Sequence, residues 1–178
     1  DVTATEYVVI NSTAGHLKDS IAASHKDTVM VKRMKVTGTI NAHDFIMMRD
    51  SMPKLTALNL KDVRIKVPTS GYIHPHWKDD EIPADCFNGK KSLTSIVFPD
   101  VLKGIESGAF AGSGLKHSLN IPEGVVEIGR GAFAGSDFTG VLTLPSALKK
   151  IDDYAFNGCC FICPLNLPDG IEEIGWGC

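Results

Sequence analysis

The second half of the chain repeats every 23 residues. Four phenylalanines lie at this spacing, and a glycine follows each of them two positions later. They are Phe87, Phe110, Phe133 and Phe156, followed by Gly89, Gly112, Gly135 and Gly158. A fixed period of about 20–30 residues is typical of solenoids, in which each repeat adds one coil and packs against its neighbours. The repeat therefore predicts stacked coils with the phenylalanines in one buried column.

Alignment on the phenylalanines brings further columns into register. Apolar residues recur nine, eleven, fifteen and eighteen positions after each one, and a proline recurs after twelve. In the copy that begins at Phe133 these residues are Leu142, Leu144, Leu148, Ile151 and Pro145. Alternation at positions nine and eleven predicts a short, half-buried strand, which the proline ends because it has no N–H. The positive φ that glycine tolerates predicts a turn after each phenylalanine.

These columns resemble the BspA-like leucine-rich repeat over residues 82–178. The motif is carried by Gly131-Ala132-Phe133, by residues 142–145, and by Leu148 and Ile151. A partial unit at residues 55–60 matches residues 93–98 almost residue for residue. The resemblance implies an α/β fold: a right-handed leucine-rich-repeat solenoid of mainly short parallel strands.

The same resemblance implies a function. Proteins of this family are secreted or surface-attached bacterial proteins, many of them described as adhesins. We therefore expect a non-enzymatic binding module with no cofactor, whose partner is a host or bacterial surface protein or a glycan. The chain begins at Asp1 without a signal-type apolar stretch. This start fits a processed surface or secreted protein, with a lipid anchor on a removed N-terminal segment as one route to the surface.

Residues 1–54 depart from the repeat and are expected to form an α/β cap over the first coil. The pattern predicts a helix around Leu17 and Ile21, capped by Ser12 or Thr13, and a strand within residues 28–39. A second helix is predicted at about residues 41–50. Its caps are Asn41 and Asp44, and its apolar face is Phe45, Ile46, Met47 and Met48. The remainder divides into the partial unit 55–65, an inserted loop 66–81 and the repeats 82–178.

The inserted loop is the first candidate for ligand contact. If Leu58 occupies the position of Ile96, their separation of 38 residues exceeds one repeat by 15. Long loops on a repeat scaffold are commonly functional. Its candidate contact residues are Tyr72, His74, His76, Trp77 and Lys78. The alternative is structural, with the loop folded back so that Trp77 and Tyr72 fill a gap in the coil below.

The outward side of the predicted strands is the second candidate. It comprises Ser95, Val97, Ser118, Asn120, Val141, Thr143, Pro164 and Asn166. We take Asn120, Thr143 and Asn166 as candidate contacts. These side chains are small and nearly uncharged, so they specify no particular ligand.

Charge and composition narrow the choice of partner. The net charge is −3 and the pI about 6.1, with neither half strongly charged, which argues against nucleic acid as the main partner. The apolar runs are only a few residues long, too short for a transmembrane helix.

Signals for chemistry are weak. His74-Pro75-His76 with Asp79 and Asp80 has residue types that suit zinc, but no regular element places a further ligand. Cys160 and Cys163 form a CxxC within an expected turn rather than at a helix N-terminus. We therefore predict no catalytic, cofactor or metal residues. The alternative is an enzyme or metal-binding protein with its site in the loop 66–81.

The last residue, Cys178, falls in the small-residue column of Cys86, Ala109, Ala132 and Ala155, one position before the next expected phenylalanine. We expect further repeats or a cap beyond it, and end-to-end self-association of the fragment.

Overall fold

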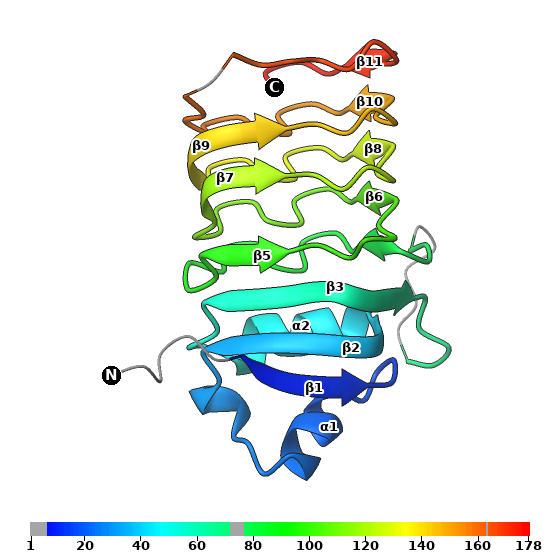
Figure 1. Ribbon diagram of the computed structural model, residues 1–178, viewed down its shortest axis with the longest axis vertical. Coiled ribbons are helices and arrows are strands. Elements are labelled where there is room, and N and C mark those ends of the chain that lie inside the picture. Colours follow the sequence, from blue (N-terminus) through cyan, green and yellow to red (C-terminus); the bar gives the residue numbers. More distant parts are fainter. Residues whose placement is uncertain (1–6, 72–76, 163) are drawn as a thin grey trace.

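The computed structural model describes residues 7–71, 77–162 and 164–178. Parallel strands stack into two ladders on two sides of a column of coils (Figure 1). The first ladder holds β1 (Val8–Ser12), β2 (Arg33–Asn41), β3 (Ala57–Lys66) and β5 (Ser95–Val97), followed by the separate pair β7 (Lys116–Asn120) and β9 (Asp137–Thr143). The second holds β4 (Glu81–Ile82), β6 (Gly104–Ile105), β8 (Glu127–Ile128), β10 (Lys150–Ile151) and β11 (Glu173–Ile174). This is an α/β repeat fold of mainly short parallel strands.

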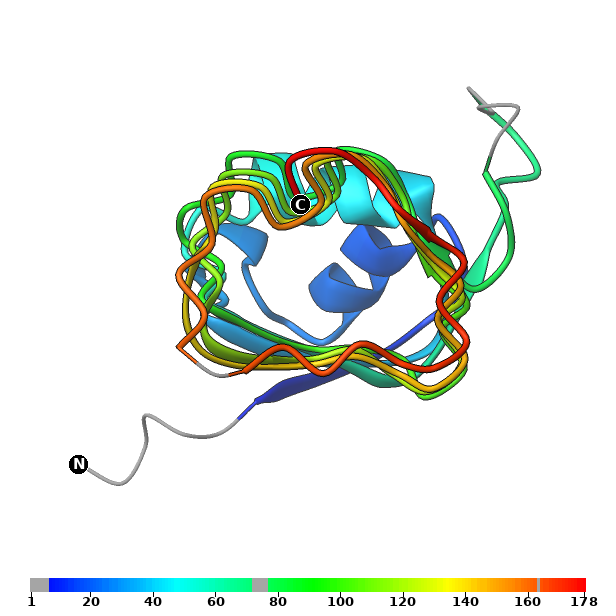
Figure 2. The ribbon, with the colours of Figure 1, turned by 90° about the horizontal axis from the view of Figure 1, so that it is seen from above.

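The helices belong to the N-terminal segment. They are α1 (Leu17–Ala23), a 3₁₀ turn (Thr28–Met30) and α2 (Ala42–Ser51). Seen along the column, the coils from β5 onwards lie nearly on top of one another (Figure 2). The first ladder runs along one side, and α2 lies on the opposite side, below the phenylalanine turns.

The phenylalanines form the column that the repeat predicts. Successive ring centroids of Phe87, Phe110, Phe133 and Phe156 are 5.7, 5.3 and 5.5 Å apart, with nearly parallel planes. The first three are fully buried, whereas Phe156 in the last complete repeat is half-buried. Phe45 of α2 meets Phe87 edge-on at 5.7 Å, so the N-terminal segment supplies the first ring of the column.

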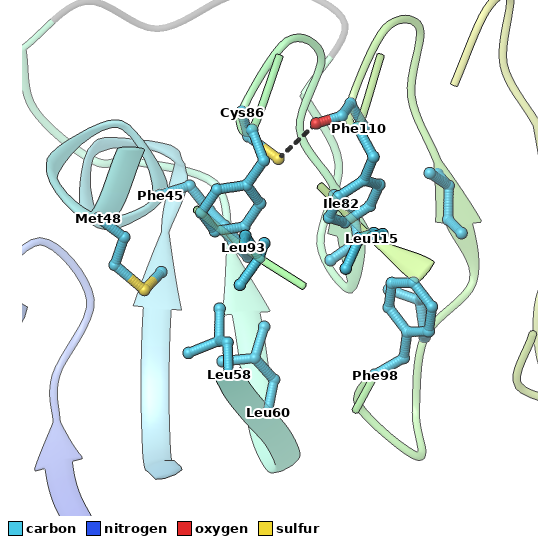
Figure 3. Packing of buried hydrophobic residues seen from close by; sticks show 14 of the residues in the cluster. Phe45, Met48, Leu58, Leu60, Ile82, Cys86, Leu93, Phe98, Phe110 and Leu115 are labelled. Atoms are coloured by element: carbon cyan, nitrogen blue, oxygen red, sulfur yellow. Dashed lines mark hydrogen bonds between the residues drawn. The ribbon is translucent and has the colours of Figure 1, made fainter. Parts of the chain in front are cut away.

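The predicted turn after each phenylalanine is confirmed. The glycines at this position have φ between +60° and +74°, a region that side-chain-bearing residues disfavour. The small residue before each phenylalanine is buried, and the Cys86 thiol donates to the carbonyl of Ala109 at 3.7 Å (Figure 3).

Three of the four predicted repeat strands form, as β5, β7 and β9. Leu58 lies beside Ile96 in the β3–β5 register, as the match between residues 55–60 and 93–98 predicts. The strand predicted around Leu165 is wrong, since no regular strand forms there and the Leu165 side chain is 54% exposed. Pro164 precedes it and has no N–H to donate, and among the described residues the last backbone bond of this coil to β9 is that from Ile162 N to Gly140 O.

The first helix is capped differently from the prediction. Neither Ser12 nor Thr13 caps it; α1 begins at Leu17, and its flanking residue His16 makes no side-chain cap. Instead the buried Asp44 carboxylate accepts from Gly15 N at 2.6 Å and Leu17 N at 2.9 Å. The cap comes from a residue distant in sequence, which local pattern does not indicate.

Asp44 also completes the predicted start of α2. The Asn41 side chain accepts from the backbone of His43 and Asp44, and Asp44 accepts from Asn41 N. Phe45 and Met48 face the core, but Ile46 is exposed, so the predicted apolar face is too wide.

The strand predicted from residue 28 begins later, at Arg33. Asp27 accepts from Val29 N at 3.0 Å and starts a 3₁₀ turn over residues 28–30 instead.

Lys90 joins the N-terminal segment to the first complete repeat. Its ammonium donates to the carbonyls of Arg49 and Met52 at 2.8 and 2.7 Å, at the C-terminal end of α2. Burial lowers the pKa of Lys90. Because helix ends leave carbonyls without intrahelical partners, this lysine satisfies two of them inside the protein.

We predict that Phe133→Ala lowers the free energy of unfolding by about 3–5 kcal/mol, because rings on both sides confine the void. Urea unfolding measures the loss, and Val126→Ala, at an exposed position, is the control. An unchanged midpoint for the phenylalanine variant would contradict the stacked column.

We predict that Lys90→Met lowers the free energy of unfolding by about 1–3 kcal/mol, since the buried carbonyl of Met52 and the partly buried carbonyl of Arg49 lose their donor. Lys91→Met removes a neighbouring, exposed lysine and should change it by less than about 0.5 kcal/mol. Equal effects in thermal unfolding of the two variants would show that the ammonium contacts contribute nothing.

Candidate functional site

The first ladder is interrupted between β5 and β7. β5 pairs with β3 and β7 pairs with β9, but β5 and β7 do not pair with each other. Their coils are joined at one end, where Lys116 N donates to Thr94 O at 3.3 Å, and on the return side, where Val126 N donates to Lys103 O at 2.9 Å. The interruption therefore lies between two backbone connections, one at each end, and Figure 1 shows β5 and β7 as neighbouring strands of the column.

A change of spacing explains the interruption. In the coil of β5, the first inward residue is Leu93, six positions after Phe87. In the next three coils, the inward residue comes five positions after the phenylalanine: Leu115, Phe138 and Phe161. Leu119 therefore follows its first inward residue by four positions, whereas Ile96 of β5 follows by three. The chain accommodates the extra residue at His117, which has φ +68° and lies beside a register irregularity. The edges of β5 and β7 consequently do not match.

The opening forms a groove of about 520 Å³. Its apolar floor includes Ile96, Phe98, Leu115, Leu119 and Phe138, and Val97 and Pro122 also line it. Leu115 and Phe98 belong to the buried cluster of the first coils (Figure 3). Ile96 is only half-buried, although its register neighbour Leu58 is fully buried. The groove thus reaches through the strand layer to core side chains.

Backbone polar groups line the two edges. Ser95 N donates to Thr56 O on the β3 side, so the next residue, Ile96, points its N–H and C=O towards β7. Ile121 N donates to Thr143 O on the β9 side, so Asn120 points its backbone groups towards β5. In the part of the chain that the structure describes, no strand pairs with these two edges.

Charged side chains occupy the two ends of the groove. Lys116 lies where β7 begins, and Asp100 and Glu123 follow the prolines beyond β5 and β7. Asp100 is 4.0 Å from Lys61 Nζ, and Glu123 accepts from Ser146 N and Oγ, both at 3.1 Å. The groove therefore has a basic end and an acidic end.

The predicted strand-face contacts are partly brought together. Asn120 lies on the groove rim, and Thr143 is its exposed register partner on β9. Asn166 is exposed in the irregular segment and is not aligned with them by a strand. Sequence reasoning missed the groove itself, and the signal that could have revealed it is the change from six to five residues before the first inward position.

The predicted loop contacts lie elsewhere. Tyr72, His74 and His76 fall outside the described residues. Trp77 is half-buried with its ring 6.0 Å from that of His43, and the exposed Lys78 is 3.4 Å from Glu81. The loop leaves the column on the side of the second ladder (Figure 2).

Two acidic residues of the loop, Asp79 and Asp80, have partners outside the 77–81 segment. Asp79 accepts from Lys66 Nζ at 2.6 Å and from Val67 N at 2.9 Å, and these bonds lower its pKa. The buried Asp80 is 3.3 Å from Arg64 and accepts from Ile65 N. Among residues 7–71, 77–162 and 164–178, no group of three or more His, Cys, Asp or Glu side chains could hold a metal ion.

Of the two cysteines of the CxxC, the structure describes Cys160, and Cys163 lies outside the described residues. Cys160 is an exposed free thiol. The neighbouring Cys159 donates to Phe133 O at 3.2 Å, and burial raises its pKa to about 11. A thiol with a raised pKa is a poor nucleophile at neutral pH.

An acidic recess of about 210 Å³ lies on the second ladder. The recess follows one row of register neighbours in the second ladder, which are, in order, Glu81, Gly104, Glu127 and Lys150. Lys150 Nζ lies 3.5 Å from Glu127 and 3.6 Å from Asp152. Gly104 has no side chain, so Glu81, Glu106 and Glu127 surround the recess with Lys78 as the nearby cation. Burial, followed by hydrogen bonding to Glu81, raises the pKa of Glu106 to about 7.

Comparison with known proteins identifies the repeat. A family model described as the BspA type leucine rich repeat region (6 copies) matches residues 80–178, which is more than half of the chain and includes β4 to β11. None of the curated proteins matches the chain. No helix within the described residues is long and apolar enough to cross a membrane.

We predict that the protein becomes less stable as pH rises from about 4.5 to about 7. Over this range the folded state keeps a proton on Glu106 that the unfolded state has released, so deprotonation favours unfolding. The loss should be about 1 kcal/mol, because the half-exposed carboxyl is screened by water.

Urea unfolding at several pH values measures this dependence. Glu106→Gln should flatten it, whereas Glu172→Gln, at an exposed position, should leave it unchanged. The same slope in wild type and Glu106→Gln would show that Glu106 is not the titrating group.

Proposed function

Because the chain belongs to the family of BspA-type leucine-rich repeat proteins, we propose that it binds a partner protein through the exposed side of its first ladder, at the groove between β5 and β7. Repeats of this family generally serve as non-enzymatic binding modules. The observation that carries the proposal is the groove, which opens the strand layer to core side chains although stacking alone would close it.

A protein partner is favoured over a glycan. The groove combines an apolar floor with unpaired peptide groups, and another polypeptide can match both kinds of group. The exposed side around it carries small side chains such as Ser95, Ser118 and Thr143, which allow close approach.

We further infer that the coils form a right-handed solenoid, with residues 1–54 as the N-terminal cap and residues 55–178 as the repeat array. The support is the continuation of the first ladder into β1 and β2, together with the Lys90 contacts to the end of α2. The inferred setting is the surface or exterior of a bacterium, where the module serves in adhesion. Proteins with such repeats are typically bacterial surface proteins.

The loop 66–81 is not proposed as an enzyme or metal site. Its three described carboxylates, Asp79, Asp80 and Glu81, already lie against Lys66, Arg64 and Lys78 respectively. Trp77 is half-buried, and its ring lies 6.0 Å from that of His43.

The test uses an array of secreted and cell-surface proteins beside a glycan array. We predict binding to array proteins that weakens at least about tenfold when Asn120 and Thr143 are both changed to lysine, because bulk and charge then crowd the groove rim at Asn120 and the exposed side next to it at Thr143. Val126→Lys, at an exposed position on the return side, is the control, and deletion of residues 70–80 should leave binding intact.

Binding to glycans alone would contradict a protein partner. Equal losses in the double lysine variant and in Val126→Lys, or a loss confined to the loop deletion, would contradict the proposed surface.

A further inference from the structure

We propose that the groove between β5 and β7 takes up an extended peptide segment of the partner, which places an aliphatic side chain on the apolar floor and pairs its peptide groups with the backbone edges. This inference rests on the proposed function, because it names the chemistry recognised by the same surface. Three properties of the groove lead to it: its unpaired backbone, its apolar floor and its opposed charges.

The backbone edges favour an extended partner. Ile96 of β5 and Asn120 of β7 direct N–H and C=O groups into the groove, where the described residues provide no strand to pair with them. An extended peptide presents donors and acceptors at regular intervals, and strand addition is a common mode of peptide recognition. A helix satisfies its backbone groups internally and offers none to these edges.

The floor favours an aliphatic side chain. Ile96 belongs to a core column but is half-buried, and Leu115 and Phe138 lie beneath the groove. A partner side chain placed between β5 and β7 would cover Ile96, so that it becomes as fully buried as its register neighbour Leu58 in the coil below. Burial of apolar surface then adds affinity that the backbone contacts alone do not supply.

The charges favour a segment with one basic and one acidic residue. Lys116 marks the end where the strands begin, and Asp100 and Glu123 mark the end where they finish. In an extended chain, residues two positions apart lie on the same face and are separated by about 6.6 Å. A segment with an acidic residue two positions before or after the aliphatic one, and a basic residue on the other side, matches both ends of the groove.

The experiment uses two synthetic peptides of equal composition and the full 178-residue chain labelled for NMR. The peptides are acetyl-Ser-Glu-Ser-Ile-Ser-Lys-Ser-amide and acetyl-Ser-Lys-Ser-Ile-Ser-Glu-Ser-amide. We predict that one of them binds at least about fivefold more tightly than the other and shifts the amide signals of Ile96 and Asn120. The tighter peptide reports the direction of the bound segment.

Changes in the tighter peptide separate the contributions. Replacement of its isoleucine by serine should weaken binding about tenfold or more, and methylation of the isoleucine amide nitrogen about fivefold. A peptide that binds equally well after both changes would overturn the proposal.

Protein variants give the matched controls. Asp100→Asn should weaken the tighter peptide about threefold and reduce its salt dependence, whereas Asp169→Asn, at the same repeat position three coils later, should not. Val97→Lys on the groove rim should weaken binding more than Val141→Lys, whose side chain is similarly exposed but outside the groove. Failure of both peptides to bind, or equal effects in each variant pair, would overturn the proposal.

The outcome can be separated from that of the proposed function. If both peptides fail while the double lysine variant of Asn120 and Thr143 still loses its protein partner, the exposed side binds without strand pairing, and only this inference is wrong. If a peptide binds but the double lysine variant keeps its partners, the groove is real and the proposed function is wrong.

Discussion

Stacking of equivalent side chains between successive coils is the interaction on which the rest of the structure depends. No single coil can bury both of its faces, so each phenylalanine is covered only because the next coil presents another at the same position. The rings of Phe110 and Phe133, 5.3 Å apart and almost parallel, show how closely the period is kept. Both ladders of parallel strands follow from this regular stacking. Coils that superimpose bring equivalent backbone segments to the separation at which neighbouring strands form hydrogen bonds.

The N-terminal segment covers the first coil with a phenylalanine of its own, as a preceding repeat would. Phe45 reaches the column from a helix rather than from a turn, and it meets Phe87 edge-on instead of face to face. The carbonyls at the end of that helix then accept hydrogen bonds from Lys90 of the first repeat. Although this segment lacks the repeat, it thereby covers the first ring of the coil above it and provides acceptors for the ammonium of Lys90.

The repeat columns could be read from the sequence because they depend on periodic burial, and the register of Leu58 with Ile96 followed from them. Features set by single long-range contacts could not be read in this way. The Asp44 cap of α1 joins residues 27 positions apart, and the missing strand near Leu165 reflects one proline. The groove could be predicted from the sequence only in part. Its cause, the shift from Leu93 to Leu115 relative to the phenylalanines, is visible in the sequence, but its consequence for pairing appears only when the two edges are placed side by side.

The interrupted ladder also divides the column in its folding. In a linear array, stability is shared between neighbours, so the weakest junction separates the units that open together. Between the coils of β5 and β7 the first ladder contributes a single backbone bond, from Lys116 to Thr94. The junction relies on the phenylalanine stack, on backbone bonds between the phenylalanine turns such as that from Phe87 N to Ala109 O, and on the bonds of the second ladder. Amide exchange should therefore resolve two blocks, one that extends from β1 to β5 and one from β7 onwards. The groove that is proposed to take up a partner thus also marks a junction at which the first ladder adds little to the cooperativity of folding.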